Sequence, residues 1–131
     1  MLGRRENDIY GIDTLDDIKL MCEQEAKNNG QTIVFRQTNI EGELVSWIQE
    51  ALGEFDAIII NPAAYTHSSI AIHDAIKAVE LPLIEVHLSN IYKREEFRQK
   101  SYISTVALGV ICGLGKTGYK LALNALAEHD K

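Results

Sequence analysis

Two side chains that could exchange a proton lie two residues apart in the segment IEVHLSN, residues 84–90. The apolar residues of this segment predict a buried strand, and alternate residues of a strand share a face, so Glu85 and His87 point the same way. A carboxylate that binds one ring nitrogen fixes the imidazole tautomer and leaves the other nitrogen to move a proton. A structural pair at a sheet edge is the alternative. Because burying both groups on a central strand is costly, we favour a catalytic pair.

A second group of polar residues follows the apolar run AIII, residues 57–60. Asn61 comes directly after this run, and His67 lies at the end of the small-residue segment PAAYT. Small residues there would let a ligand approach the backbone. Taken alone, Asn61 fits a turn and His67 fits a solvated helix start equally well.

Tyr10 and two arginines further along are weaker candidates. Tyr10 follows Arg4 and Arg5 closely, and a nearby cation lowers the pKa of a phenol from its usual value of about 10. Arg94 and Arg98 are four residues apart, so a helix would present both guanidinium groups on one side. The alternatives are a frayed chain start and a solvated charge run.

Helical and strand patterns alternate along the chain and would position these residues. Periodic apolar residues after the N-cap candidate Thr14 predict a helix that ends before Gly30, and Pro82 ends the third predicted helix. Alternating strands and helices predict an α/β fold with a parallel sheet, whose carboxyl ends gather functional residues. The predicted helices are 14–30, 41–53, about 68–81 and about 118–128, and the predicted strands are 31–37, 56–61, 83–90 and 106–112.

Size and charge limit the function classes. The chain has 131 residues, 46% of them hydrophobic, and a formal net charge of −6. One soluble domain therefore fits residues 1–131, and the negative charge argues against binding to nucleic acid. Only Cys22 and Cys112 are present, so neither a disulfide framework nor a zinc site is expected, and a reducing cytoplasm fits. The sequence also lacks the roughly 20 apolar residues of a membrane helix.

The segment GLGKTG, residues 113–118, matches the glycine pattern of dinucleotide-binding loops. That fingerprint needs a further strand and an acidic residue about 20 positions later, and the sequence given ends within the next predicted helix. We interpret these glycines as allowing tight packing between a strand and a helix. A flavodoxin-like binding or receiver module is also disfavoured, because Asn61 stands where a receiver would carry its phosphoacceptor.

Four long segments together resemble the type II 3-dehydroquinate dehydratases. These segments are FRQTNIEGELVSWIQEA, IIINPAAYTHSSIAIHDAI, IEVHLSNIYKREEFRQKSYIS and GVICGLGKTGYKLAL, at residues 35–51, 58–76, 84–104 and 109–123. The resemblance implies a flavodoxin-like three-layer sandwich and a dodecamer built of trimers. It also implies anti elimination of water from 3-dehydroquinate through an enolate, which gives 3-dehydroshikimate in the shikimate pathway without a metal or organic cofactor.

The resemblance assigns roles to individual positions. Tyr10 matches the general base and Arg5 the arginine that keeps it ionised, while His87 matches the proton donor to the leaving hydroxyl and Glu85 its orienting partner. Leu88 and Ser89 match the backbone amides that hold the substrate carboxylate. Asn61, His67 and Arg98 match residues that bind the ring hydroxyls. Asp74 matches an aspartate that contacts the substrate from a neighbouring subunit, and Arg94 matches an arginine that supports the site.

The sequence also departs from the family pattern. Residues 1–13 match the lid segment, but Asn7 replaces the proline of the usual Arg-Glu-Pro motif, and His73 stands where many relatives have arginine. Relatives carry about a dozen further residues before Leu2, with a first, central strand and an asparagine turn that helps to stabilise the enolate. We therefore expect that strand to be missing. An inactive family member that only assembles or binds a small molecule is the alternative function.

Overall fold

The computed structural model describes residues 14–93 and 101–129, apart from the side chains of Ala64 and His67. In this part of the chain, three parallel strands form one sheet in the order β1-β2-β3. The strands are β1 (Ile58–Ile60), β2 (Leu83–His87) and β3 (Gly109–Cys112). β2 is therefore the central strand, with Glu85 in register with Ile60 on one side and Val110 on the other. The predicted α/β class with a parallel sheet is confirmed.

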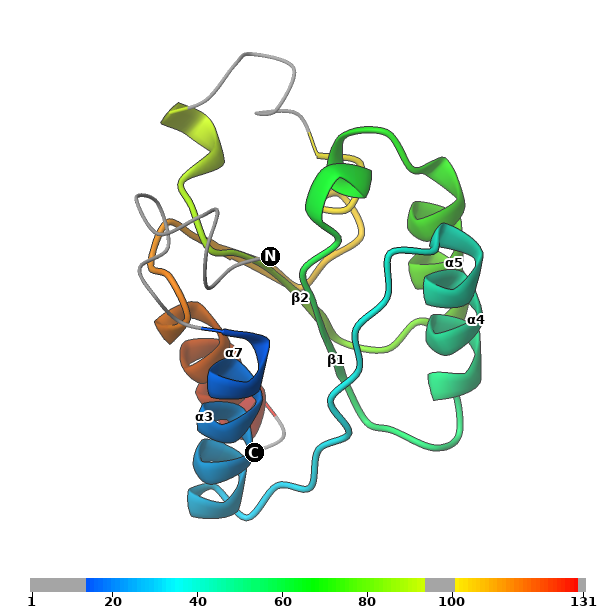
Figure 1. Ribbon diagram of the computed structural model, residues 1–131. Coiled ribbons are helices and arrows are strands. Elements are labelled where there is room, and N and C mark those ends of the chain that lie inside the picture. Colours follow the sequence, from blue (N-terminus) through cyan, green and yellow to red (C-terminus); the bar gives the residue numbers. More distant parts are fainter. Residues whose placement is uncertain (1–13, 94–100, 130–131) are drawn as a thin grey trace.

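Helices cover both faces of the sheet and complete a three-layer arrangement. Figure 1 shows α3 and α7 together on one side of the strands, and α4 and α5 together on the other. Two short 3₁₀ helices, η1 (Ala63–His67) and η2 (Ile91–Lys93), follow the carboxyl ends of β1 and β2. The α-helices are α3 (Leu15–Asn28), α4 (Glu41–Ala51), α5 (Ile70–Val79) and α7 (Thr117–His129).

Local signals in the sequence set the helix boundaries. The Thr14 hydroxyl accepts a hydrogen bond from the Asp17 amide, and the Asp17 side chain accepts one from the Thr14 amide, which completes a capping box at the start of α3. Ser69 caps α5, because its hydroxyl accepts a hydrogen bond of 3.0 Å from the Ile72 amide. α5 ends at Val79, shortly before Pro82. These boundaries agree with the sequence prediction to within two or three residues.

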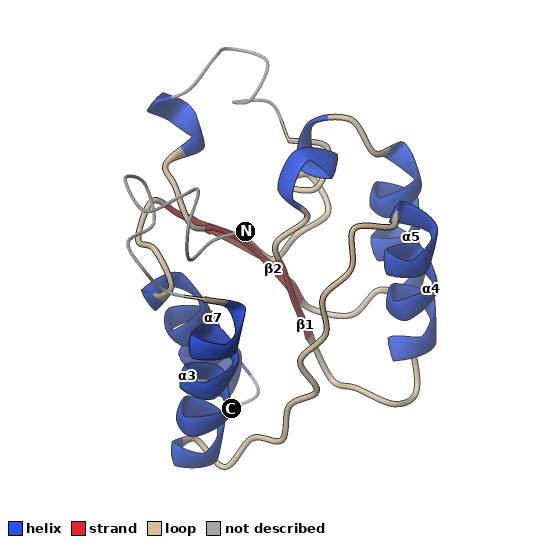
Figure 2. Cartoon of the chain, viewed as in Figure 1, coloured by secondary structure: helices blue, strands red, loops and turns tan. Residues whose placement is uncertain are grey.

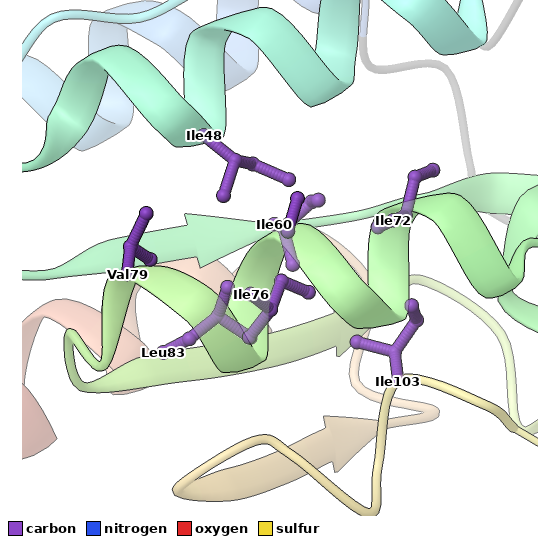
Figure 3. Close-up of a cluster of buried hydrophobic side chains, with 8 residues drawn as sticks. Ile48, Ile60, Ile72, Ile76, Val79, Leu83 and Ile103 are labelled. Atoms are coloured by element: carbon purple, nitrogen blue, oxygen red, sulfur yellow. The ribbon is translucent and has the colours of Figure 1, made fainter.

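The largest cluster of buried apolar side chains lies between the sheet and the α4–α5 layer. Figure 3 shows Ile60 and Leu83 of the strands packed against side chains of α4 and α5, with Ile103 closing one end. Ile72 and Ile103 are completely buried. This cluster fixes α5 and the segment around Ile103 against the face of β2 that carries Glu85 and His87.

Residues 31–37 do not form the predicted strand. Figure 2 shows the connection between α3 and α4 as a loop. Its side chains alternate as a strand's would, since Ile33 and Phe35 pack against the core while Val34 is exposed. Within the described residues, however, β1 pairs with β2 alone and this segment has no ladder partner. The prediction was wrong because side-chain alternation does not supply backbone hydrogen bonds.

The glycines of the segment GLGKTG have the structural role predicted for them. Gly113 has a φ of +88°, and a Cβ atom there would lie 3.1 Å from Asn90 Cβ. A Cβ atom on Gly118 would lie 3.1 Å from Val86 Cγ1. Glycine at these positions therefore allows the turn after β3 and the close approach of α7 to the sheet.

The predicted lid segment, residues 1–13, lies outside the described residues. β3 is shorter than the predicted strand 106–112, since it begins at Gly109. The predicted absence of a first, central strand stays a prediction.

Candidate active site

Glu85 and His87 form a buried pair on the central strand. Glu85 is completely buried, and His87 is 5% exposed. The Oε2 atom of Glu85 is hydrogen-bonded to Nε2 of His87. Cys112 is the register partner of His87 on β3. The structure therefore brings together the carboxylate and imidazole that strand alternation predicted, at the carboxyl end of β2.

Two serines that the sequence analysis missed complete the environment of Glu85. Ser104 Oγ donates a hydrogen bond of 2.8 Å to Oε1, and Ser101 Oγ lies 3.2 and 3.1 Å from Oε1 and Oε2. Both belong to the turn after the charge run that contains Arg94 and Arg98. The only sequence signal was a pair of hydroxyl residues three apart in KSYIS, which is too common to identify a site.

Competing effects set the pKa of Glu85. Burial alone would raise it, because a carboxylate loses hydration. Hydrogen bonds from His87, Ser104 and Ser101, together with the charge of His87, outweigh burial and hold the pKa of Glu85 below its usual value of 4.5. The carboxylate is therefore ionised at neutral pH and can stabilise a positive charge on the imidazole.

Asn61 follows β1 and turns toward the opposite helix layer. Its Oδ1 atom accepts a hydrogen bond of 3.1 Å from the Ala63 amide, which forms a tight turn. Its side chain is also hydrogen-bonded to Tyr119 of α7. Burial raises the pKa of Tyr119, Asn61 opposes this shift and Cys22 adds to it. The phenol is therefore neutral and holds Asn61 at the edge of the site.

Leu88 and Ser89 continue the chain beyond β2. The Leu88 side chain is buried between α3 and α7, and its carbonyl accepts a hydrogen bond of 2.9 Å from the Gly115 amide. In the part of the chain that the structure describes, the amide N–H groups of Leu88 and Ser89 donate to no acceptor. Two consecutive unused donors next to His87 are suited to bind an anionic group.

Comparisons with known proteins agree on one family. The family model for class II dehydroquinases matches residues 1–127. A protein of Brucella canis named 3-dehydroquinate dehydratase is 59% identical over all of this chain and 83% of its own length. One of the same name from Phenylobacterium zucineum is 55% identical over 97% of this chain and 88% of its own. The crystal structure of the type II dehydroquinase from Propionibacterium acnes superimposes with a TM-score of 0.93 at 45% identity, covering 97% of this chain and 88% of that one.

The chain belongs to the class II dehydroquinase family. Several site residues predicted from that resemblance cannot be placed, since Arg5, Tyr10, Arg94 and Arg98 lie outside the described residues. His67 ends η1. Asp74 is exposed on α5, with its Oδ1 atom 2.9 Å from Nδ1 of His73. It therefore lies apart from the buried pair within this single chain.

Across residues 14–93 and 101–129, no three His, Cys, Asp or Glu side chains gather as a metal site requires. Among the helices described, none is long and apolar enough to cross a membrane.

Proposed function

We propose that this chain is a 3-dehydroquinate dehydratase, a hydro-lyase of the shikimate pathway that leads to aromatic amino acids. It removes water from 3-dehydroquinate by anti elimination through an enolate and releases 3-dehydroshikimate. The family match over residues 1–127 supports this proposal. The observation that carries it is the buried Glu85–His87 pair at the carboxyl end of the central strand, because elimination of a hydroxyl group needs a positioned proton donor.

His87 is the proposed general acid. Ionised Glu85 can only accept hydrogen bonds, so His87 Nε2 carries the proton between them. The other ring nitrogen, Nδ1, is then the atom that faces substrate. A proton on Nδ1 passes to the departing C1 hydroxyl and forms water, and Glu85 stabilises the imidazolium before this step.

Tyr10 is the proposed general base, with Arg5 as its partner. The phenolate takes the proton from C2, which leaves an enolate, and the guanidinium of Arg5 favours the ionised phenol. Base and acid act on opposite sides of the ring, as an anti elimination requires. Both residues lie in the segment 1–13, which we propose to be a lid on the single domain 1–131.

The remaining predicted residues are assigned to substrate binding. The unused amides of Leu88 and Ser89 are suited to the substrate carboxylate. The side chains of Asn61, His67 and Arg98 are assigned to the ring hydroxyls. Asp74 is exposed, and exposure is compatible with a contact to substrate in a neighbouring subunit.

The assembly and cell compartment are proposed from the same resemblance. A dodecamer of trimers would bring Asp74 of one subunit to the site of the next. The proposed reaction needs no cofactor, because proton transfer alone achieves it. Cytoplasmic location fits the two free cysteines, Cys22 and Cys112.

A direct assay tests the proposal. Purified protein is incubated with 3-dehydroquinate, and the conjugated product is followed by its ultraviolet absorbance. We expect activity that His87→Ala lowers by about 100-fold to 10,000-fold, the usual contribution of a general acid. The matched control is His129→Ala, at the exposed end of α7, which should retain full activity. Absence of activity in the assembled wild-type protein, or equal losses in both variants, would contradict the proposal.

A further inference from the structure

The turn from Ser101 to Ser104 is built around the carboxylate of Glu85. The Ile103 side chain anchors it in the core without exposure. The Tyr102 amide ties it to the β1–α5 connection through a hydrogen bond of 2.9 Å to the Thr66 carbonyl. Both hydroxyl groups of the turn reach Glu85 from these fixed backbone positions.

The Ser101 hydroxyl can act only as a donor to Glu85. A serine oxygen has two lone pairs and one proton. Its Oγ atom accepts hydrogen bonds from the amides of Ile103, at 3.1 Å, and Ser104, at 3.0 Å. Both lone pairs are thus occupied by the turn itself, and only the proton remains for the carboxylate. The geometry therefore requires Glu85 to accept.

Three side chains in the described part of the chain donate to the Glu85 carboxylate. Oε1 receives Ser101 and Ser104, while Oε2 receives Ser101 and His87. Ser101 has a single proton, which the two oxygens share, so three donor hydrogens serve the roughly four lone-pair directions of the carboxylate. A protonated carboxyl group would need an acceptor for its own hydrogen, and Ser101 cannot provide one. The turn thus supplies donors that favour the ionised carboxylate, and it fixes the orientation of the group that holds His87.

We propose that Ser101 and Ser104 are positioning residues for the dehydration, which act through Glu85 to fix the orientation and tautomer of His87. This inference rests on the proposed function. The contribution of the two serines differs from ordinary packing. In the part of the chain that the structure describes, they and His87 are the side chains that donate hydrogen bonds to Glu85.

Among the described residues, the strands and α5 surround Glu85 mainly with apolar side chains. Its register partners are Ile60 on β1 and Val110 on β3. α5 packs on this face with Ile72, Ala75, Ile76 and Val79. The titratable neighbours on this face of the strands are His87 and its register partner Cys112. Changes in the ionisation of Glu85 therefore report on its serine donors and on His87.

The first test compares Ser104→Ala with Ser104→Thr, which keeps the hydroxyl group. We expect Ser104→Ala to lower kcat by about tenfold, the equivalent of one hydrogen bond to a charged group, with KM changed less than about twofold. Ser104→Thr should recover most of the lost kcat. The matched control is Thr105→Ala, since Thr105 is exposed on the same turn and its hydroxyl donates to the Tyr102 carbonyl at 3.3 Å rather than to Glu85.

A double-mutant cycle asks whether Ser104 acts through Glu85. Ser104→Ala is introduced into the wild-type and the Glu85→Gln protein. The kcat is then measured for the wild type, the two single variants and the double variant. If the serine works by fixing the carboxylate, its effect on kcat should shrink below about twofold in the Glu85→Gln background. An unchanged tenfold loss in that background would overturn the proposal.

A spectroscopic measurement gives an answer that does not depend on activity. The carboxyl carbon of Glu85 is followed against pH in ¹³C-glutamate-labelled protein, with its signal assigned by its loss in Glu85→Gln. Removing a donor to the ionised form should raise the pKa of Glu85 in Ser101→Ala and Ser104→Ala but not in Thr105→Ala. If the serine variants titrate as the wild type does, the proposal fails, even if the protein has no dehydratase activity. If they titrate as expected in an inactive protein, only the proposed function fails.

Discussion

Buried ionisable groups lie on both faces of the sheet, and the two faces treat them oppositely. On the α4–α5 side, Glu85 is held ionised, with its pKa below the usual value. On the α3–α7 side, burial and the nearby Glu23 raise the pKa of Cys22 to about 11. Burial also raises the pKa of Tyr119 on that side.

The difference shows that burial alone does not decide the charge of a group. Loss of hydration favours the neutral form of all three side chains. It is outweighed only at Glu85, where His87, Ser101 and Ser104 converge. Cys22 instead packs among apolar residues such as Ile18 and Leu123. The carboxylate that converging donors hold ionised can therefore support proton transfer, whereas Cys22 and Tyr119 stay neutral at neutral pH.

The largest expected effect follows from removing the charge on the first face. Glu85→Gln keeps the shape of the side chain, but its amide group can no longer accept from every donor or stabilise an imidazolium. We expect kcat for 3-dehydroquinate to fall by about 100-fold to 1,000-fold, because the proton donor loses its orientation and charge partner. Steady-state assays measure this. Glu80→Gln, on an exposed residue directly after α5, should behave as the wild type, and a fully active Glu85→Gln would remove the distinction between the faces.

The same substitution tests how much the ionised carboxylate of Glu85 stabilises the fold. Because the pKa of Glu85 is lower in the folded protein than its usual 4.5, its charge stabilises the fold above that pH, and the benefit disappears as pH falls through the folded value. We expect wild type to exceed Glu85→Gln by about 2 to 3 kcal/mol in free energy of unfolding at neutral pH. Urea unfolding of both proteins from neutral to acid pH measures the difference, which should narrow below about pH 4.5. A difference that does not vary with pH would mean that the carboxylate is not held ionised by folding.

Cys22, on the α3–α7 side of the sheet, should lower the free energy of unfolding at alkaline pH. The pKa of Cys22 rises from 9.0 to about 11 on folding, so the unfolded chain releases the thiol proton first as pH increases. Between about pH 9 and 11 this favours the unfolded state by on the order of 2 kcal/mol. Urea unfolding measures the free energy of unfolding of the wild-type protein and of Cys22→Ala. The difference between the two free energies should be constant up to about pH 9 and should then change in favour of Cys22→Ala. If the two free energies change with pH in parallel above about pH 9, this account is contradicted.

Local periodicity predicted most of the elements and the central pair of the site. Glu85 and His87 share a face because strand residues alternate, which requires no knowledge of the fold. The N-cap candidate Thr14 identified the start of α3 for the same local reason. The segment 31–37 has the same alternation, yet it forms no strand, since a strand also needs a partner that local pattern cannot reveal.

The donors to Glu85 were not predictable in this way. Ser101 and Ser104 lie 16 and 19 residues beyond it along the chain. Their contact depends on how the turn packs through Ile103, which is a tertiary result. The bond between Asn61 and Tyr119 joins β1 to α7 and likewise had no local signal. Sequence thus predicted the pairing of Glu85 with His87, and the fold supplied the serine donors that lower the pKa of Glu85.

The smallest expected effect concerns Tyr119, where a single donor opposes burial. Asn61→Ala removes the hydrogen bond that lowers the pKa of Tyr119, so this pKa should rise further. Alkaline titration of phenolate absorbance measures the change, as the difference between each protein and its Tyr119→Phe counterpart. The Asn61→Ala substitution should have no effect on the titration in the Tyr119→Phe background. If the pKa of Tyr119 does not move, its shift comes from burial and Cys22 alone, and one donor is too weak to affect a group on this face.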